Sequence, residues 1–74
     1  MTKLGLFLTR RSVNKAEIAR RTGISKTRIT QLSNNAKTKL TAEELYKIAL
    51  SISIKPCDLL MEVCGDITLP EQSK

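Results

Sequence analysis

The side chains best suited to chemistry in this sequence lie between residues 26 and 31. If this stretch is helical, Ile29 and Leu32 turn inward, and the opposite face is polar and able to form hydrogen bonds. That face is formed by Lys26, Thr27, Arg28, Thr30 and Gln31. Such a face suits the donor and acceptor pattern of base edges, as a helix that enters the major groove of DNA requires.

Basic charge is concentrated in the first part of the chain. The 74 residues carry a net charge of +6, but residues 1–40 contain ten basic residues and one acidic residue, whereas residues 41–74 contain three basic and six acidic residues. A polyanion would approach the first part and be repelled by the second. A basic surface alone fits a solvated face without a partner equally well, so charge supports the interpretation without deciding it.

The residue types that most other functions need are missing. The sequence has no histidine, and it has no recognisable nucleophile with a base, phosphate-binding glycine loop or carboxylate pair. We therefore expect no enzyme and no cofactor. A chain of this length has no second domain for a ligand, so we also expect no small-molecule ligand.

The two cysteines and the hydropathy bear on the compartment. Cys57 and Cys64 would lie about 10 Å apart on one helix, beyond the roughly 7 Å that a disulfide allows. We expect reduced thiols in a cytoplasmic protein without a metal site. A membrane span needs about 20 apolar residues; neither such a stretch nor a signal peptide is found, so we expect no membrane partner.

Apolar spacing predicts the helices that must hold the polar face. We expect an all-α domain of five short helices over residues 1–65, followed by a tail over 66–74 that is loose or contains a short strand. The first helix is expected over about 2–10, where Gly5 is unfavourable. Pro56 suits the first position of the fifth helix.

Three helices have clear start signals. Asn14, Ser25 and Thr41 are good N-cap residues, and each is preceded by an apolar residue. Glu17 and Glu44 stand three residues after two of these caps, the arrangement of a capping box. The pattern predicts that the second, third and fourth helices begin at these positions.

A glycine separates the second and third helices. Gly23 suits a left-handed turn because it has no Cβ to clash. Asn34 and Asn35 are expected to end the third helix, since asparagine is the next best residue for positive φ. Two short helices joined by a glycine turn form a helix-turn-helix element.

The run NKAEIARRTGISKTRITQLSNN resembles the helix-turn-helix of the Xre family, the class of Cro and the lambda-type repressors. The run KLTAEELYKIALSISIKPCDLL is similar to the fourth and fifth helices of that family. The resemblance covers roughly residues 4–63. It implies the lambda-repressor-like fold of five helices and double-stranded DNA as the partner.

The resemblance also implies roles for individual residues. Positions that reach base edges correspond to Lys26, Thr27 and Gln31, with Thr30 as an addition, and their chemistry agrees with base contacts. Positions that hold phosphates correspond to Asn14 and Lys15 at the start of the second helix, where backbone N–H groups favour an anion. The other candidate phosphate contacts are Arg28, Asn34, Lys37 and Lys39.

The sequence departs from the family pattern at several positions. Many members pair an arginine of the first helix with a glutamate that ends the third, but here Leu8 and Ser33 occupy these positions. Both partners are absent together, so no unpaired charge is left buried. Lys15 stands where glutamine is frequent, and Asn35 and Ser53 stand where glycine is usual.

The sequence as a whole predicts a bacterial or phage regulator of transcription that binds double-stranded DNA sequence-specifically. We expect a homodimer on a palindromic site, with Leu60, Met61 and Cys64 as the dimer interface. The alternative is a protein-interaction module of the same fold, an antitoxin-like or anti-repressor partner. A steep loss of DNA affinity with increasing salt would favour the DNA-binding regulator. Absence of DNA binding even at low salt would favour the protein-interaction module.

Overall fold

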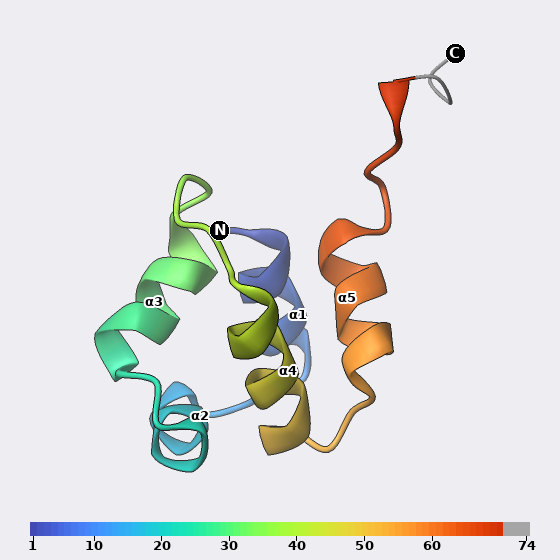
Figure 1. Cartoon of the computed structure of the whole chain (residues 1–74). Coiled ribbons are helices and arrows are strands. Elements are labelled where there is room, and N and C mark those ends of the chain that lie inside the picture. The colour runs from blue at the N-terminus through green and yellow to red at the C-terminus, as the bar shows by residue number, and fades with distance from the viewer. Residues whose placement is uncertain (71–74) are drawn as a thin grey trace.

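The computed structural model describes residues 1–70, and in this part of the chain every regular element is a helix. Figure 1 shows α3 and α5 on opposite sides of the molecule, with α1 and α4 between them. The helices are α1 (Lys3–Arg10), α2 (Lys15–Thr22), α3 (Lys26–Asn34), α4 (Ala42–Ser51) and α5 (Pro56–Cys64). The all-α prediction is confirmed.

The start of the predicted tail contains no strand. Residues 67–69 have no regular structure, so the alternative of a short strand there is wrong. The remainder of the predicted tail, residues 71–74, lies outside the described residues. Among residues 1–70, no helix combines the length and apolar character required to cross a membrane.

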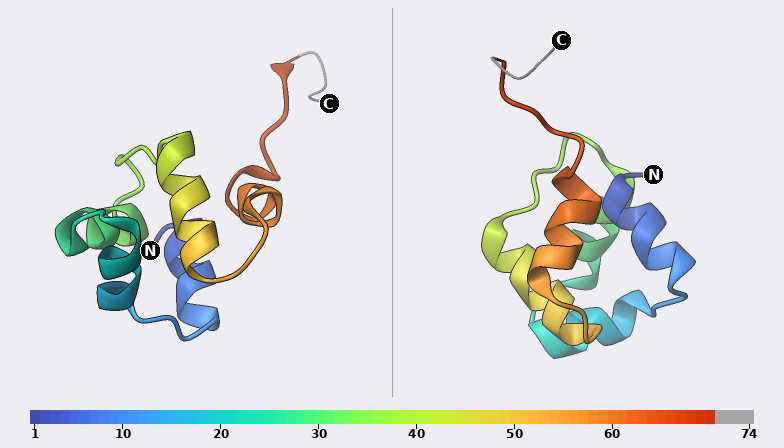
Figure 2. Two further views of the ribbon diagram at one scale, coloured as in Figure 1. Left: turned by 60° about the horizontal axis from the view of Figure 1, so that its bottom comes forward. Right: turned by 90° about the vertical axis from the view of Figure 1, so that its right-hand side faces the viewer.

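One hydrophobic core joins all five helices. Pairs of helices pack as α1 with α3 and α5, α2 with α3 and α4, and α4 with α5. Figure 2 shows the same arrangement from two further directions. The buried apolar side chains are Leu4, Leu8, Ile18, Ile29, Leu32, Leu45, Ile48, Ala49 and Leu59. Burying the apolar stripe of each short helix supplies the stability that it lacks alone.

The predicted N-caps all form. The Asn14 side chain accepts hydrogen bonds from the backbone N–H groups of Ala16 and Glu17, at 2.8 and 3.4 Å. Ser25 caps α3 in the same way, and Thr41 caps α4 within a complete capping box. The predicted capping box at α2 is wrong, because the Glu17 carboxylate binds the guanidinium groups of Arg20 and Arg21 instead.

The turn residues agree with the predictions at one position and differ at another. Gly23 has φ = 79°, the left-handed conformation expected of it. Asn35 follows the end of α3 but has φ = −112°, so the predicted left-handed end of α3 is wrong there. Ser53 does adopt positive φ, at 59°, in the turn before α5.

The start of α1 lies against the end of α3. The backbone N–H of Thr2 donates to the Ser33 carbonyl oxygen at 2.9 Å, and the Thr2 hydroxyl donates to the Leu32 carbonyl oxygen at 2.7 Å. A Cβ on Gly5 would lie 2.1 Å from the same Ser33 oxygen. Gly5, unfavourable for α1 on its own, is therefore required by the close approach of these two helices.

Candidate nucleic-acid interface

The α2–turn–α3 unit presents α3 with one face in the core and one in solvent. Ile29 and Leu32 are buried on the inner face, and the Gly23 turn sets the direction in which α3 leaves α2. Of the predicted base-contacting residues, Lys26, Thr27 and Gln31 are exposed, and Thr30 is half-buried. Asn34 is exposed at the end of the same helix.

Several lysines around α3 have no acidic partner. Within residues 1–70, none of Lys15, Lys26, Lys37 and Lys39 forms an ion pair. The acidic residues of this region pair elsewhere or lie on α5. The positive charge of these four lysines is therefore not neutralised by a paired carboxylate, as a surface that attracts a polyanion requires.

The α3–α4 loop has its own hydrogen bonds. The Asn35 side-chain oxygen accepts a hydrogen bond from the Lys37 backbone N–H at 2.9 Å, and the Asn35 carbonyl oxygen accepts one from the Thr38 N–H at 3.0 Å. This asparagine turn holds the loop while Lys37 and Lys39 remain exposed. Asn35 therefore shapes the loop, a role that its side chain fulfils without positive φ.

The predicted phosphate site at the start of α2 is partly used by the protein itself. The Asn14 side chain already caps two backbone N–H groups of α2, and Lys15 is half-buried. The charge of Lys15 and the helix dipole remain as attractions for an anion.

Arg28 has a different environment from the other cationic candidates. Its Nε donates to Oε2 of Glu44 at 2.8 Å, and its Nη2 donates to Oε1 of Glu44 at 3.0 Å and to the Lys39 carbonyl oxygen at 2.9 Å. The hydrogen bond from Arg28 lowers the pKa of Glu44 to about 2. Sequence reasoning assigned Glu44 only to helix capping, since its distance from Arg28 in the chain hides the pairing.

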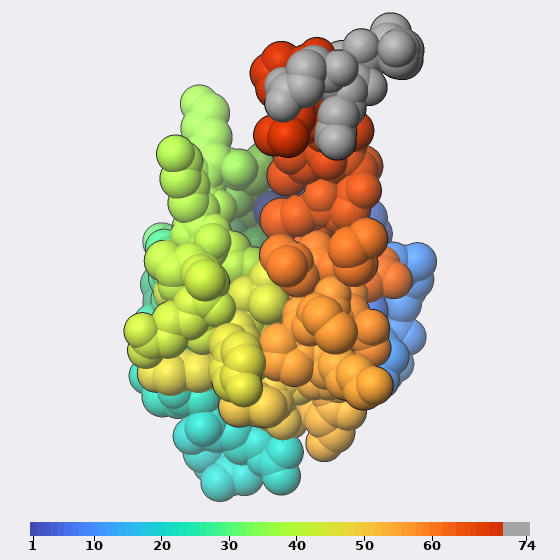
Figure 3. Space-filling view, turned by 45° about the vertical axis from the view of Figure 1, so that its right-hand side comes forward, coloured from blue at the N-terminus to red at the C-terminus, as the bar shows by residue number. Residues whose placement is uncertain are grey.

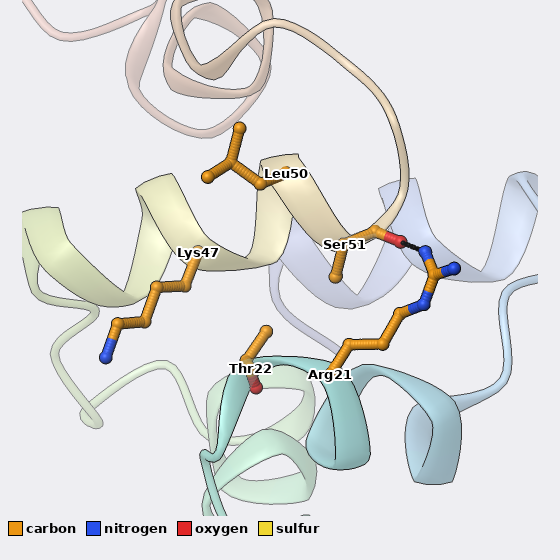
Figure 4. Close-up of a pocket in the computed structure, with 5 residues that line it drawn as sticks. All are labelled: Arg21, Thr22, Lys47, Leu50 and Ser51. Carbon is orange, nitrogen blue, oxygen red and sulfur yellow. Dashed lines mark hydrogen bonds between the residues drawn. The ribbon is translucent and has the colours of Figure 1, made fainter.

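The arginines at the end of α2 are bound within the protein. Figure 4 shows Arg21 reaching from α2 to the end of α4, where its Nη1 donates to the Ser51 carbonyl oxygen at 2.9 Å. A hydrogen bond from Arg20 lowers the pKa of Glu17. The shallow hollow between α2 and α4, lined also by Thr22 and Leu50, has no arrangement of groups that indicates a ligand.

The predicted dimer residues lie on the far side of the molecule. Leu60 and Met61 are 48% and 66% exposed, and Cys64 is half-buried. Figure 3 shows a hollow between the α3–α4 loop and the chain that follows α5. This groove of about 770 Å³ has Leu60 and Ile67 on one side and Leu40 on the other.

The fold and this surface define a helix-turn-helix protein. Two short helices meet at a glycine turn, and the second exposes polar side chains among unpaired lysines. The chain belongs to the family of Cro/C1-type HTH DNA-binding domains, which matches residues 3–63. Neither a curated protein nor a solved structure matches the chain. The resemblance to Cro and the lambda-type repressors is thus confirmed, and with it a DNA-binding domain of a typically non-enzymatic family.

Proposed function

We propose that this protein regulates transcription by binding double-stranded DNA sequence-specifically, with α3 in the major groove. The observation that carries the proposal is the exposure of Lys26, Thr27 and Gln31 on α3, beside lysines without acidic partners. Gln31 can pair with adenine, Lys26 can donate to guanine, and Thr27 can offer its methyl group to thymine. Thr30, half-buried on the same helix, is an additional candidate for a base contact.

Phosphate contacts would orient α3 without reading sequence. We assign them to Asn14 and Lys15 at the start of α2, Asn34 at the end of α3, and Lys37 and Lys39 in the loop. All five residues lie on or next to the helix-turn-helix element. The guanidinium of Arg28 is bound to Glu44, so we leave this arginine out of the set.

Selection of binding sites from random duplexes at two salt concentrations tests the proposal. We expect one enriched sequence and a steep fall in affinity with salt. Gln31→Ala should relax the preference at one base step, at a cost of about 1–3 kcal/mol on the preferred site. If no duplex binds even at low salt, the domain is a protein-interaction module instead.

A charge-matched pair of variants tests the phosphate contacts. Lys37→Gln should weaken binding to all duplexes alike and reduce the salt slope by about 0.9. Lys55→Gln removes the same charge at the start of α5, on the side away from α3, and should change the slope little. Equal effects of the two variants would mean that only net charge matters.

We further propose that two copies pair through α5. Cys57, Leu60, Met61 and Cys64 follow the i, i+3, i+4, i+7 spacing of a helix face that packs on another helix, yet none of them is fully buried. In an antiparallel pair with its two-fold axis between positions 60 and 61, Cys57 of one copy would lie opposite Cys64 of the other. Such a pair would present two α3 helices to a palindromic site.

Cross-linking with a short bismaleimide tests this pairing. A dimer of Cys57→Ser alone, or of Cys64→Ser alone, has no two thiols that face each other. When the two variants are mixed, each mixed dimer has one Cys57 opposite one Cys64. We expect faster formation of covalent dimer in the mixture than in either variant alone. Equal rates in all three samples would contradict the antiparallel arrangement.

A further inference from the structure

We propose that Glu44 is a positioning residue for DNA recognition, which holds the Arg28 guanidinium against the α3–α4 loop and so keeps it from DNA phosphates. The inference rests on the proposed function and concerns what restrains the α3 surface. It assigns to Glu44 and Arg28 a role that neither the helix-turn-helix pattern nor the capping pattern predicts.

The geometry ties three parts of the molecule together at one carboxylate. Glu44 accepts two hydrogen bonds from Arg28 on α3, in the parallel arrangement that arginine and carboxylate groups prefer. Its Oε1 also accepts the Thr41 backbone N–H at 3.0 Å, which completes the cap of α4. Arg28 in turn donates to the Lys39 carbonyl oxygen, so the lysine-bearing loop is held at the same point.

This link spans a part of the fold that backbone packing leaves open. The backbones of α3 and α4 do not come close together, although each packs on α2. Among the residues that the structure describes, the Arg28–Glu44 pair provides the side-chain hydrogen bonds between these two helices. The position of the loop relative to α3 therefore depends on this pair as well as on the apolar core that the two helices share.

The pair is well placed to persist when DNA approaches. The Glu44 side chain is only 18% exposed and that of Arg28 is 34% exposed. The pKa of Glu44, at about 2, keeps its charge across the whole physiological pH range. Partial burial weakens screening of the pair by salt, so it competes well with a solvated phosphate.

The consequence for recognition concerns specificity. Arginine binds phosphate through two parallel hydrogen bonds, and such contacts carry no sequence information. A free arginine in the first turn of α3 would add a contact to every duplex alike. By binding Arg28, Glu44 limits sequence-independent affinity and leaves the reading of bases to the exposed residues of α3.

Four variants test the role on a duplex without the selected site. Glu44→Gln keeps an oxygen for the Thr41 cap but weakens the hold on Arg28; we expect tighter binding and a salt slope steeper by about 0.9, one phosphate. Glu43→Gln is the matched control, since it removes the same charge from the same turn of α4. In the parent protein Glu43 is paired with Lys47 and not with Arg28. The slope of Glu43→Gln should equal that of the parent.

Arg28→Gln provides a second test that does not need Glu44→Gln to fold. Because the Arg28 guanidinium is already bound to Glu44, this variant should leave the salt slope on the same duplex unchanged. The double variant, Arg28→Gln with Glu44→Gln, should lose the tighter binding and steeper slope expected of Glu44→Gln alone. Thermal melting followed by circular dichroism establishes that each protein is folded at the binding temperature.

Three outcomes would overturn the inference. A slope that falls by about 0.9 in Arg28→Gln would mean that this arginine contacts phosphate in the parent protein. Equal slopes for the Glu44→Gln and Glu43→Gln variants would mean that Arg28 is not released. Absence of duplex binding by the parent at low salt would instead defeat the proposed function, and the positioning role with it.

Discussion

Single residues in this protein act mainly through partners that are distant in the chain. Gly5 lets the backbone of α1 approach Ser33 at the end of α3, and Thr2 donates to carbonyl oxygens there. Ser33 at this junction is one of the two positions at which the family resemblance leads one to expect an arginine–glutamate pair. Here the two helices meet through hydrogen bonds to backbone carbonyl oxygens, and the absence of a side chain at Gly5 permits their close approach. No charge needs to be buried at this junction.

Gly5→Ala should destabilise the fold. Alanine favours an isolated helix by about 1 kcal/mol over glycine, but its Cβ would overlap the Ser33 carbonyl oxygen and force α1 from α3. We expect a net loss of about 2 kcal/mol in the free energy of unfolding, measured by urea denaturation. Thr9→Ala, at an exposed position of α1, is the control, and a stabilised Gly5→Ala protein would contradict the close approach.

Glu44 should also make stability depend on pH. Because its pKa is lowered from 4.5 to about 2, its contribution is fully present above about pH 4.5 and is lost as the pH falls towards 2. Urea unfolding of Glu44→Gln at several pH values should give a curve that falls less steeply in this window than that of the parent. A parallel pair of curves would show that the Arg28–Glu44 pair does not form.

At the level of helices and turns, side-chain caps mark where α1 to α4 begin, whereas α5 begins with Pro56 and has no side-chain cap. Thr41 and Ser25 cap their helices as their positions predict. Ser53 and Asn35 both stand where the family usually has glycine, but only Ser53 adopts positive φ. Substitution by glycine should therefore affect the free energy of unfolding differently at the two positions.

Substitution by glycine should separate these two turns. Ser53→Gly should raise the free energy of unfolding by about 0.5–1 kcal/mol, since glycine adopts positive φ without strain. Asn35→Gly should lower it by a similar amount, because it removes the hydrogen bond to the Lys37 N–H and adds chain entropy. Thermal denaturation of both variants measures the difference, and stabilisation by Asn35→Gly would mean that the loop has another conformation.

The whole molecule separates its charges between two sides. The unpaired lysines surround α3, whereas Asp58 and Glu62 lie on α5 and Asp66 lies two residues after its end. Figure 2 shows α3 and α5 well apart in its left view, as in Figure 1. DNA is expected to be attracted to one side and repelled from the other, which leaves α5 free for a second copy.

The salt dependence of binding should report this arrangement. Three lysines per copy at phosphates give a slope of about −3 for one copy and about −5 for a dimer on a palindromic site. Leu60→Glu should abolish the dimer and bring the slope towards the smaller value. Leu50→Glu introduces the same change at a similarly exposed leucine of α4, and an equal effect of both variants would argue against the α5 interface.

The sequence by itself determined the helices, their caps, the glycine turn and the exposed polar face of α3. These features depend on contacts within about four residues and on apolar spacing, both of which can be read along the chain. The exposure of Lys26, Thr27 and Gln31 follows from the same spacing.

Only the tertiary structure decided the contacts between distant residues. Arg28 meets Glu44 across 16 positions, and Thr2 meets Ser33 across 31. Such pairings depend on how the helices pack around their common core, which no local pattern specifies. For that reason the sequence indicated that Arg28 was a free cation, whereas in the folded protein it forms an ion pair with Glu44.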